Sequence, residues 1–369
     1  MKYLSLFSGI EAASVAWKPL GWEPVGFSEI EPFPSAVLAH HFPNTPNYGD
    51  ITKWKDWGLT PGSVNLVCAG SPCQAFSTAG LRKGLDDPRG NLALITLGLV
   101  EFLQPEWFIW ENVPGVLTSN GGRDFAAFLT ALGDIGYGWA YRVLDAQHFG
   151  LAQRRKRVWL CAYRNPVTGL GDWRPPTAVL FDSQSLCWDP AKGISERGKH
   201  SRSLEESAGE DHSRGCFWDG SQVTQTLDAV LAKGQTMPEK NRFPAVLVPS
   251  PVVLDRAAFN QGINAQYDPH IKESEQMVAL VAKGPHAVGF PAGENMKVRM
   301  ITELEAERLQ GFPDNHTQIS WKGKSPEDCP AGHRYKAIGN SWAVPCARWI
   351  GERIAIVNSI LDETKNKIG

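Results

Sequence analysis

The sequence predicts an α/β fold in which helices cover both faces of a parallel sheet. The first observation is a series of short apolar runs of strand length, namely YLSLF (3–7), PVGFS (24–28), VNLVCA (64–69), EWFIW (106–110) and RVWLCAY (157–163). The second is that helical stretches, such as NLALITLGLVEFL at 91–103, lie between these runs. Strands that alternate with helices form βα units, and such units assemble into parallel sheets.

Length and composition limit the class of protein. A chain of 369 residues with 42% apolar residues is long enough for two domains. The net charge of −2 means that any nucleic-acid surface must be local. Seven cysteines without paired spacing argue against a disulfide framework. Neither a signal peptide nor an apolar run of membrane-spanning length is evident, so we expect a soluble cytoplasmic protein.

The character of the chain changes after about residue 164, where Gly, Pro and Ser become frequent and periodicity is weak. We therefore predict a catalytic and cofactor-binding domain over 1–165, completed by 335–369, and a smaller irregular β-rich domain over 166–334. Within 299–313, Thr302 and Glu305 predict a capping box at the start of a helix that ends at Gly311. A final helix is expected at about 341–361.

Each of the first four strands ends on groups that could carry chemistry. In open α/β sheets, ligands bind beyond the carboxyl ends of the strands. The sequence therefore predicts a single crevice formed by Phe7-Ser8-Gly9, Glu29, Pro72-Cys73 and Glu111-Asn112.

The predicted crevice has features of a nucleoside site. Gly9 opens a strand-to-helix turn that a ligand can approach closely. Glu29, twenty residues later, stands where an acidic group holds ribose hydroxyls in dinucleotide-type folds. The sequence has no GxGxxG or GxxxxGKS phosphate motif, so the ligand should lack a pyrophosphate. S-adenosylmethionine fits these requirements.

Three further side chains suggest acid–base chemistry on an oxygen-rich target. Glu111 follows an apolar strand, and desolvation there would raise its pKa enough for it to donate a proton to a ring nitrogen. Arg155 and Arg157, in QRRKRVWL (153–160), share one face of a strand by the period of two. Two guanidinium groups could thus address one target.

Other interpretations are weaker. By itself, Cys73 is explained as well by a buried cysteine near a turn. Cys329 and His333 would make half a zinc site, but no matching pair lies nearby, so we expect no metal. A hydrolase that pairs Cys73 with His148 has no further support.

With these residues in view, the sequence resembles the C5-cytosine-specific DNA methyltransferases of bacterial and phage type. The family's motifs occur in order over about 1–163 and 299–355: Phe7-Ser8-Gly9, Glu29, Asp50-Ile51, SPCQ (71–74), ENV (111–113), QRRKR (153–157), RLQGFP (308–313) and AIGNS (337–341). Two departures stand out. Glu11, Ala12 and Ala13 occupy positions where the family usually has glycines, and Trp342 is bulky where a smaller aliphatic residue is common.

The resemblance implies a fold and a reaction. The fold would be a Rossmann-like S-adenosylmethionine-dependent methyltransferase sheet with a smaller, irregular β-rich target-recognition domain. The enzyme would extrude a cytosine from the duplex and attack C6 with the Cys73 thiolate. Glu111 would protonate or hydrogen-bond N3, Arg155 and Arg157 would lie near O2, and C5 would take the methyl group from S-adenosylmethionine.

The resemblance also assigns the cofactor residues. Phe7 would lie against the adenine, Glu29 would hold the ribose, and Asp50 would take the adenine amino group. The remaining cofactor positions would be Gly9, Ile10, Ile30, Ile51, Pro72, Leu92, Asn340 and Ser341. Residues 74–91 resemble the mobile loop that closes over DNA.

We therefore predict a DNA (cytosine-5-)-methyltransferase that acts in restriction–modification or DNA self-protection. Double-stranded DNA would be its partner, with bases read from the major groove by 166–298. A cognate restriction endonuclease would be a functional rather than a physical partner, and the enzyme would be a monomer. Two alternatives remain open: a tRNA cytosine-5 methyltransferase, and a catalytically silent DNA-binding protein on the same scaffold.

Overall fold

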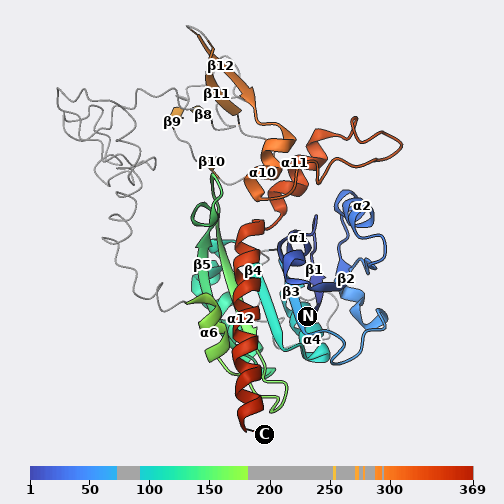
Figure 1. The fold of residues 1–369 in the computed structure, drawn as a ribbon, viewed down its shortest axis with the longest axis vertical. Coiled ribbons are helices and arrows are strands. Elements are labelled where there is room, and N and C mark those ends of the chain that lie inside the picture. The colour runs from blue at the N-terminus through green and yellow to red at the C-terminus, as the bar shows by residue number, and fades with distance from the viewer. Residues whose placement is uncertain are drawn as a thin grey trace, which may run out of the picture. The chain divides into compact units, whose positions relative to one another are not determined.

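Figure 1 shows a computed structural model of the chain. It describes residues 1–72, 92–181 and 301–368, together with the backbone of short strands between 252 and 300. The chain divides into two compact units, of which the first comprises Met1–Phe181, Gln276–Pro285 and Ile301–Gly369 and the second Asp182–Glu275 and His286–Met300. The predicted boundaries at 165 and 335 differ from this division, which groups 166–181 and 301–334 with the first unit.

A six-stranded sheet forms the centre of the first unit. Its strands lie in the order β2-β1-β3-β4-β7-β5. Their bounds are β1 Lys2–Leu6, β2 Glu23–Ser28, β3 Leu66–Ala69, β4 Trp107–Asn112, β5 Gly138–Asp145 and β7 Lys156–Tyr163. All five strands that the sequence predicts are present, whereas β5 was not predicted.

The sheet departs from the predicted parallel arrangement at one strand. β1 pairs in parallel with β2 and β3, and β3 pairs in parallel with β4, but β7 runs antiparallel to both β4 and β5. Parallel neighbours need a crossover of a dozen or more residues. The segment between β5 and β7 is shorter than that and holds only a 3-10 turn and the two-residue strand β6 (Gln153–Arg154), so β7 returns beside β5 in the opposite direction.

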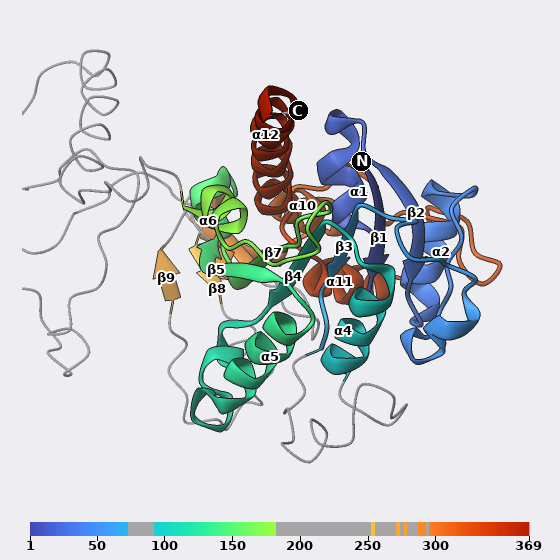
Figure 2. The same cartoon turned by 90° about the horizontal axis from the view of Figure 1, so that it is seen from below.

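Helices cover both faces of the sheet, as predicted. Figure 2 shows α1, α6 and α12 on one face and α4 and α5 on the other. The helices are α1 Ala12–Trp17, α2 Pro32–His41, α4 Leu92–Leu103, α5 Arg123–Asp134, α6 Arg174–Leu180, α10 Glu303–Gln310, α11 Ala331–Asn340 and α12 Val344–Ile368. Short 3-10 turns cover Lys18–Leu20, Ile51–Asp56, Pro114–Leu117, Ser119–Gly122 and Ala146–Phe149.

The main core lies between the sheet and the helices α4 and α5. The sequence of α4 is apolar on nearly every side, and its residues from Ala93 to Val100 are all buried. A helix that is apolar all round belongs in the interior. The core also contains Val67 of β3, Phe108 and Trp110 of β4, and Phe128 of α5. These contacts fix the central strands whose ends carry the predicted site.

The C-terminal segment begins with the predicted capping box. The Thr302 side chain accepts a hydrogen bond from the Glu305 N–H, and the Glu305 carboxylate accepts one from the Thr302 N–H. Gly311 ends α10 with a left-handed φ of 82°, which glycine adopts without strain. The final helix begins at Val344, three residues later than expected, and ends at Ile368, seven residues later than expected.

The described part of the second unit is an antiparallel sheet of order β12-β11-β8-β9. Its strands are β8 Val252–Leu254, β9 Ile271–Glu273, β11 Ala287–Ala292 and β12 Asn295–Met300. This arrangement agrees with the prediction of a smaller β-rich domain. The two-residue strand β10, Met277–Val278, belongs to the first unit and pairs in parallel with β6.

Candidate active site

The carboxyl ends of β2, β1, β3 and β4 lie along one edge of the sheet. These four strands are neighbours and all run parallel, so the residues that follow them meet at the same edge. The sequence predicts this convergence from the apolar runs and the groups that end them. In open α/β sheets, ligands bind at such an edge.

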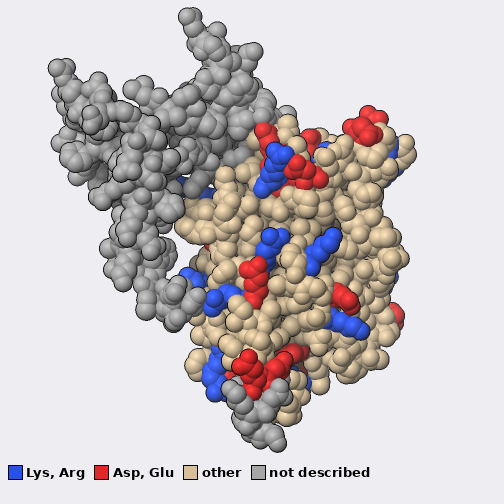
Figure 3. Space-filling model, viewed as in Figure 1, with Lys and Arg blue, Asp and Glu red and all other residues tan. Residues whose placement is uncertain are grey.

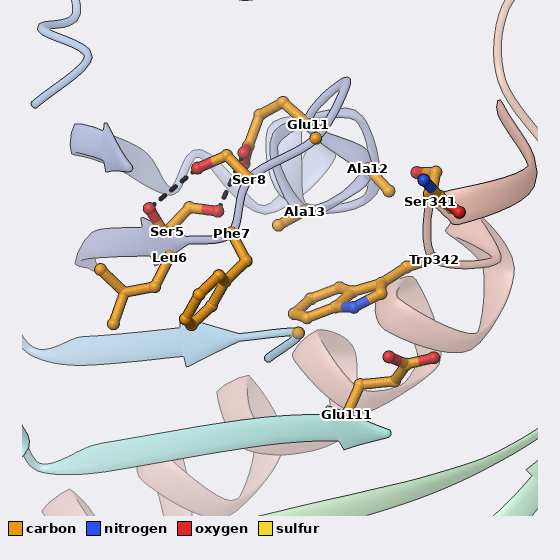
Figure 4. Close-up of a pocket in the computed structure, with 13 residues that line it drawn as sticks. Ser5, Leu6, Phe7, Ser8, Glu11, Ala12, Ala13, Glu111, Ser341 and Trp342 are labelled. Atoms are coloured by element: carbon orange, nitrogen blue, oxygen red, sulfur yellow. Dashed lines mark hydrogen bonds between the residues drawn. The ribbon is translucent and has the colours of Figure 1, made fainter. Parts of the chain in front are cut away.

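A cavity of about 40 Å³ opens at this edge (Figure 4). Its lining includes five residues that the sequence assigns to the site, and these come from both ends of the chain: Phe7, Gly9, Glu111, Asn340 and Ser341. Ser8, which the sequence places in the same crevice, also lines the cavity. The other lining residues were not assigned to the site: Ser5, Leu6, Glu11, Ala12, Ala13, Gly70 and Trp342.

The turn after β1 holds the Glu29 carboxylate in place. Phe7 and Gly9 both have left-handed φ values, 54° and 56° respectively, and this conformation is uncommon for a bulky residue such as phenylalanine. The backbone N–H of Gly9 donates to Glu29 Oε2 at 2.8 Å, and the N–H of Glu31 donates to Oε1 at 2.7 Å. Each carboxylate oxygen keeps a lone pair, so Glu29 can still accept from a ribose hydroxyl.

The predicted adenine contacts lie on the β2 side of the turn. Ile30 is 70% exposed, which is unusual for a large apolar side chain. Asp50 accepts a hydrogen bond from the Thr52 N–H at 2.9 Å, and Ser28 Oγ donates to the Gly49 carbonyl, which ties this segment to the end of β2. One exposed apolar side chain and two carboxylates on the segments at the end of β2 suit the base and the ribose of a nucleoside. These residues fit S-adenosylmethionine.

The remaining predicted cofactor residues have different environments. Ile10 and Ile51 are buried, and neither lines the cavity. Pro72 is exposed, and Leu92 is the partly buried first residue of α4. Of the predicted cofactor positions, only those at the β1 turn and in the 340–341 segment reach the cavity itself.

The segment that leads to Cys73 is held by Trp110 and by Asn112 of the ENV motif. Trp110 Nε1 donates to Ser71 Oγ at 2.9 Å, and Asn112 Nδ2 donates to the Ser71 carbonyl at 3.1 Å. Both bonds are buried, so they fix the end of β3 against β4. Cys73 and the predicted loop 74–91 lie outside the described residues.

Glu111 lies at the wall of the cavity and is only 8% exposed. Burial raises the pKa of its carboxyl, while Arg157, Arg155 and Trp342 lower it in part. Arg157 Nε lies 3.0 Å from Glu111 Oε1 as an ion pair. Its N–H is not aligned with that oxygen, and Oε1 accepts no hydrogen bond from the described residues. This oxygen therefore has bonding capacity that a bound base could use.

The two predicted arginines have different partners in the structure. Arg157 faces Glu111, whereas Arg155 is 3% exposed and its Nη2 donates to the carbonyls of Gly339 and Ser341 at 3.2 and 2.7 Å. Arg155 thus holds the returning C-terminal segment against the sheet. Both arginines lower the pKa of Glu111, but only the tertiary contacts show that their hydrogen-bond and ion-pair partners differ.

Glu11 is the most unusual lining residue. It is fully buried, has a left-handed φ of 65°, and caps the start of α1. Its carboxylate accepts hydrogen bonds from Ser5 Oγ, Ser14 N and Ser14 Oγ at 2.9–3.1 Å. Burial nevertheless raises its pKa to about 7. In the sequence, Glu11 is marked as unusual because it stands where the family usually has a glycine.

The described residues give no support for a metal centre. They contain no group of three or more His, Cys, Asp and Glu side chains that could hold a metal ion. Cys329 Sγ lies 3.6 Å from the Thr317 carbonyl, and His333 stacks on Phe33. Among the described residues, no helix is long and apolar enough to cross a membrane.

The α/β fold is that of a known methyltransferase structure. It superposes on the Dnmt2 methyltransferase of S. pombe with a TM-score of 0.56 at 17% sequence identity, covering 98% of this chain and 99% of that one. The chain belongs to the C-5 cytosine-specific DNA methylase family, whose model matches residues 1–355.

Two relatives match over nearly the whole chain. The DNA N-6-adenine-methyltransferase of Escherichia phage P1 is 32% identical over an alignment that covers 95% of this chain and 61% of the phage protein. The Type II methyltransferase M2.BsuMI of Bacillus subtilis (strain 168) is 30% identical over 362 residues, covering 96% of this chain and 75% of that protein. The chain therefore spans about three fifths of the phage relative's length.

Proposed function

We propose that this protein is a DNA (cytosine-5-)-methyltransferase that takes its methyl group from S-adenosylmethionine. The observation that carries the proposal is the Glu111 carboxyl, buried at the cavity wall beside Arg157 with Oε1 lacking an aligned partner. Burial raises the pKa of this carboxyl, which favours the protonated form that can donate to a ring nitrogen. Cytosine N3 is such a nitrogen.

The nucleophile in this proposal is Cys73. Its thiolate adds to C6 of an extruded cytosine, and the proton from Glu111 at N3 takes up the electron density that the attack places on the ring. Bonds from Trp110 and Asn112 hold Ser71, two residues before Cys73. These bonds hold Ser71 against the strand that carries Glu111.

The remaining residues hold the reactants. S-adenosylmethionine, when bound, supplies the methyl group that C5 receives. Glu29, Asp50 and Ile30 would hold its nucleoside, and Phe7, Asn340 and Ser341 would line its path into the cavity. Water then takes the C5 proton, the N3 proton returns to Glu111, and Cys73 is expelled, which restores the aromatic ring and the free thiolate.

Double-stranded DNA is the proposed substrate. The second unit would read its sequence, and the chemistry would serve restriction–modification or DNA self-protection inside a bacterial cell. On the face shown in Figure 3, Lys and Arg side chains are interspersed with Asp and Glu. This agrees with the small net charge and favours local phosphate contacts over a broad basic surface.

The printed name of the phage relative gives a second candidate, the exocyclic amine of adenine. An exocyclic amine does not require covalent attack on the ring, and it gains nothing from an acid at a ring nitrogen. The buried Glu111, paired with Arg157, therefore favours carbon methylation.

The test is to express the protein in a host without DNA methylation and analyse plasmid DNA. Nucleoside mass spectrometry distinguishes 5-methylcytosine from N6-methyladenine, and bisulfite sequencing locates the modified sites. We expect 5-methylcytosine at one recurring sequence. Cys73→Ser should abolish it while DNA binding survives, and Glu111→Gln should lower the rate at least about 100-fold.

Glu352→Gln serves as the matched control because Glu352 is exposed on α12, away from the cavity. N6-methyladenine in the plasmid would favour the second candidate. Methylated cytosine confined to the tRNA fraction would favour an RNA substrate, and DNA binding without any methylation would favour a silent binding protein.

A further inference from the structure

Trp342 enters the cavity from the C-terminal segment. It follows Ser341 directly, and Figure 4 shows its indole between the β1 turn and the Glu111 carboxyl, with the indole nitrogen on the side of that carboxyl. No role in the proposed chemistry has so far been given to this side chain.

The position of Trp342 is fixed by its surroundings. Arg155 Nη2 and Gln310 Nε2 both donate to the Ser341 carbonyl, at 2.7 and 3.1 Å, so the backbone before Trp342 is held from two elements. The indole packs edge-on against Trp159, with ring centroids 4.9 Å apart and an interplanar angle of 69°. Trp159 stands directly opposite Glu111 in the β4–β7 ladder. The Trp342 indole therefore packs against Trp159, the cross-strand neighbour of Glu111.

The indole nitrogen faces the Glu111 carboxyl in Figure 4, and Trp342 lowers the pKa of that carboxyl. The placement of this nitrogen depends on Gly70 at the end of β3. A Cβ atom at position 70 would lie 2.7 Å from Trp342 Nε1 and 3.7 Å from Glu111 Oε2. The first distance is too short for a real contact, whereas the second is an ordinary one. Gly70 thus leaves the space that brings the indole nitrogen to the acid.

We propose that Trp342 is a positioning residue, whose indole N–H holds the Glu111 carboxyl in the orientation from which it acts on the target pyrimidine. The inference rests on the proposed role of Glu111 as the acid. Arg157 pairs with Oε1, and the indole nitrogen of Trp342 lies on the side of the same carboxyl, while Oε1 keeps its capacity to accept a hydrogen bond from the base.

The charged and titratable groups that face Glu111 determine the sign of the pH effect. Arg157 and Arg155 lower the pKa of Glu111, as does the Trp342 N–H, and the Cys346 thiol also lies within its electrostatic reach. Loss of the indole N–H removes a group that favours the charged carboxylate. The pKa of Glu111 should then rise, because desolvation is less opposed.

The experiment measures kcat for methyl transfer from pH 6 to 9 in the wild type and in Trp342→Phe. Phenylalanine keeps an aromatic ring against Trp159 but has no N–H. We expect kcat at pH 7 to fall about tenfold and the alkaline limb of the profile to move up by roughly one pH unit. If Trp342 had only a structural role, Trp342→Phe would lower the melting temperature and leave the alkaline limb of the kcat profile where it is in the wild type.

Gly70→Ala tests the same contact from the other side. The added methyl group displaces the indole nitrogen without altering Trp342, so the alkaline limb should move in the same direction. In the double variant with Trp342→Phe, the alanine should add less than about twofold, because the clashing nitrogen is absent. Gly70→Ala also provides the test if Trp342→Phe fails to fold.

The outcomes separate the inference from the proposed function. If the wild type methylates cytosine but both single variants have its pH profile, the inference is wrong and the function stands. If the two substitutions act independently in the double variant, the contact between positions 70 and 342 is not the cause. If the wild type makes no 5-methylcytosine at any pH, the role of Glu111 fails, and the inference fails with it.

Discussion

A single residue, Glu11, shows how this chain departs from the pattern of its family. At a left-handed φ a glycine is unstrained, whereas Glu11 adopts φ 65° and places its carboxylate in the interior. The three hydrogen bonds from Ser5 and Ser14 offset part of the cost of burying the charge. The hydrogen bonds do not offset the whole desolvation free energy, so burial raises the pKa of Glu11 to about 7.

Glu11 should therefore make folding stability depend on pH. Its folded pKa of about 7 lies above its ordinary value of 4.5, so the folded state holds the proton more tightly than the unfolded state. Stability from this group is complete below pH 4.5 and is lost as the pH rises through 7. Glu11→Gln does not titrate. Between pH 5.5 and 8, we expect the free energy of unfolding of Glu11→Gln to gain about 2 kcal/mol relative to wild type.

Urea titrations at the two pH values check this prediction. Glu352→Gln, at an exposed position, should follow the wild type at both. Equal differences between Glu11→Gln and wild type at both pH values would mean that the Glu11 carboxyl has its ordinary pKa in the folded protein.

At the scale of one element, α10 connects a local sequence signal to the site. Its capping box depends only on Thr302 and Glu305, which lie three residues apart. Its other end carries Gln310, whose side chain donates to the carbonyls of Ile338 and Ser341 in the segment that leads to Trp342. A loss of helix stability at 302 should therefore loosen that segment.

Thr302→Ala removes the cap and should lower the free energy of unfolding by about 1 kcal/mol, as measured by chemical denaturation. Thr302→Ser keeps an oxygen that can accept from the Glu305 N–H, so it should retain most of that stability. The prediction is wrong if the serine and alanine variants are equally destabilised.

At the scale of the whole first unit, α12 closes the fold by packing against the first helix. Trp17 Nε1 donates to the Ala347 carbonyl at 2.8 Å, and Trp107 Nε1 donates to Asn358 Oδ1 at 2.9 Å. Gly351 allows the close approach, since a Cβ atom there would lie 2.5 Å from the Trp17 ring. The two ends of the chain thus share one packed layer over the sheet, which Figure 2 shows.

Gly351→Ala tests this packing by the sign of its effect. Alanine favours a helix over glycine by about 1 kcal/mol, yet here we expect a loss of about 1–3 kcal/mol from the clash with Trp17. Gly332→Ala in α11 is the matched control, because nothing lies within 4 Å of its added Cβ atom. Thermal melting should show a lower Tm for the first variant and an equal or higher Tm for the second. Stabilisation of both variants would contradict the close approach of α12 to α1.

Local sequence determined the elements and the edge of the sheet that carries the site. Apolar runs closed by glycine, proline or an acidic residue define β1 to β4, and parallel βα units bring the ends of these strands together. The capping box of α10 and the position of Phe7, Gly9, Glu29 and Glu111 at this edge could therefore be predicted without coordinates. The roles of these four residues stay predictions, as does that of the Cys73 nucleophile.

Tertiary structure alone decided the direction of β7, the separate partners of Arg155 and Arg157, and the place of Trp342 beside Glu111. Each depends on contacts between residues far apart in the sequence, and a local pattern does not record which of several neighbours a side chain will meet. The reversal of β7 follows from a connection too short for a crossover, and the contact of Trp342 follows from the space that Gly70 leaves.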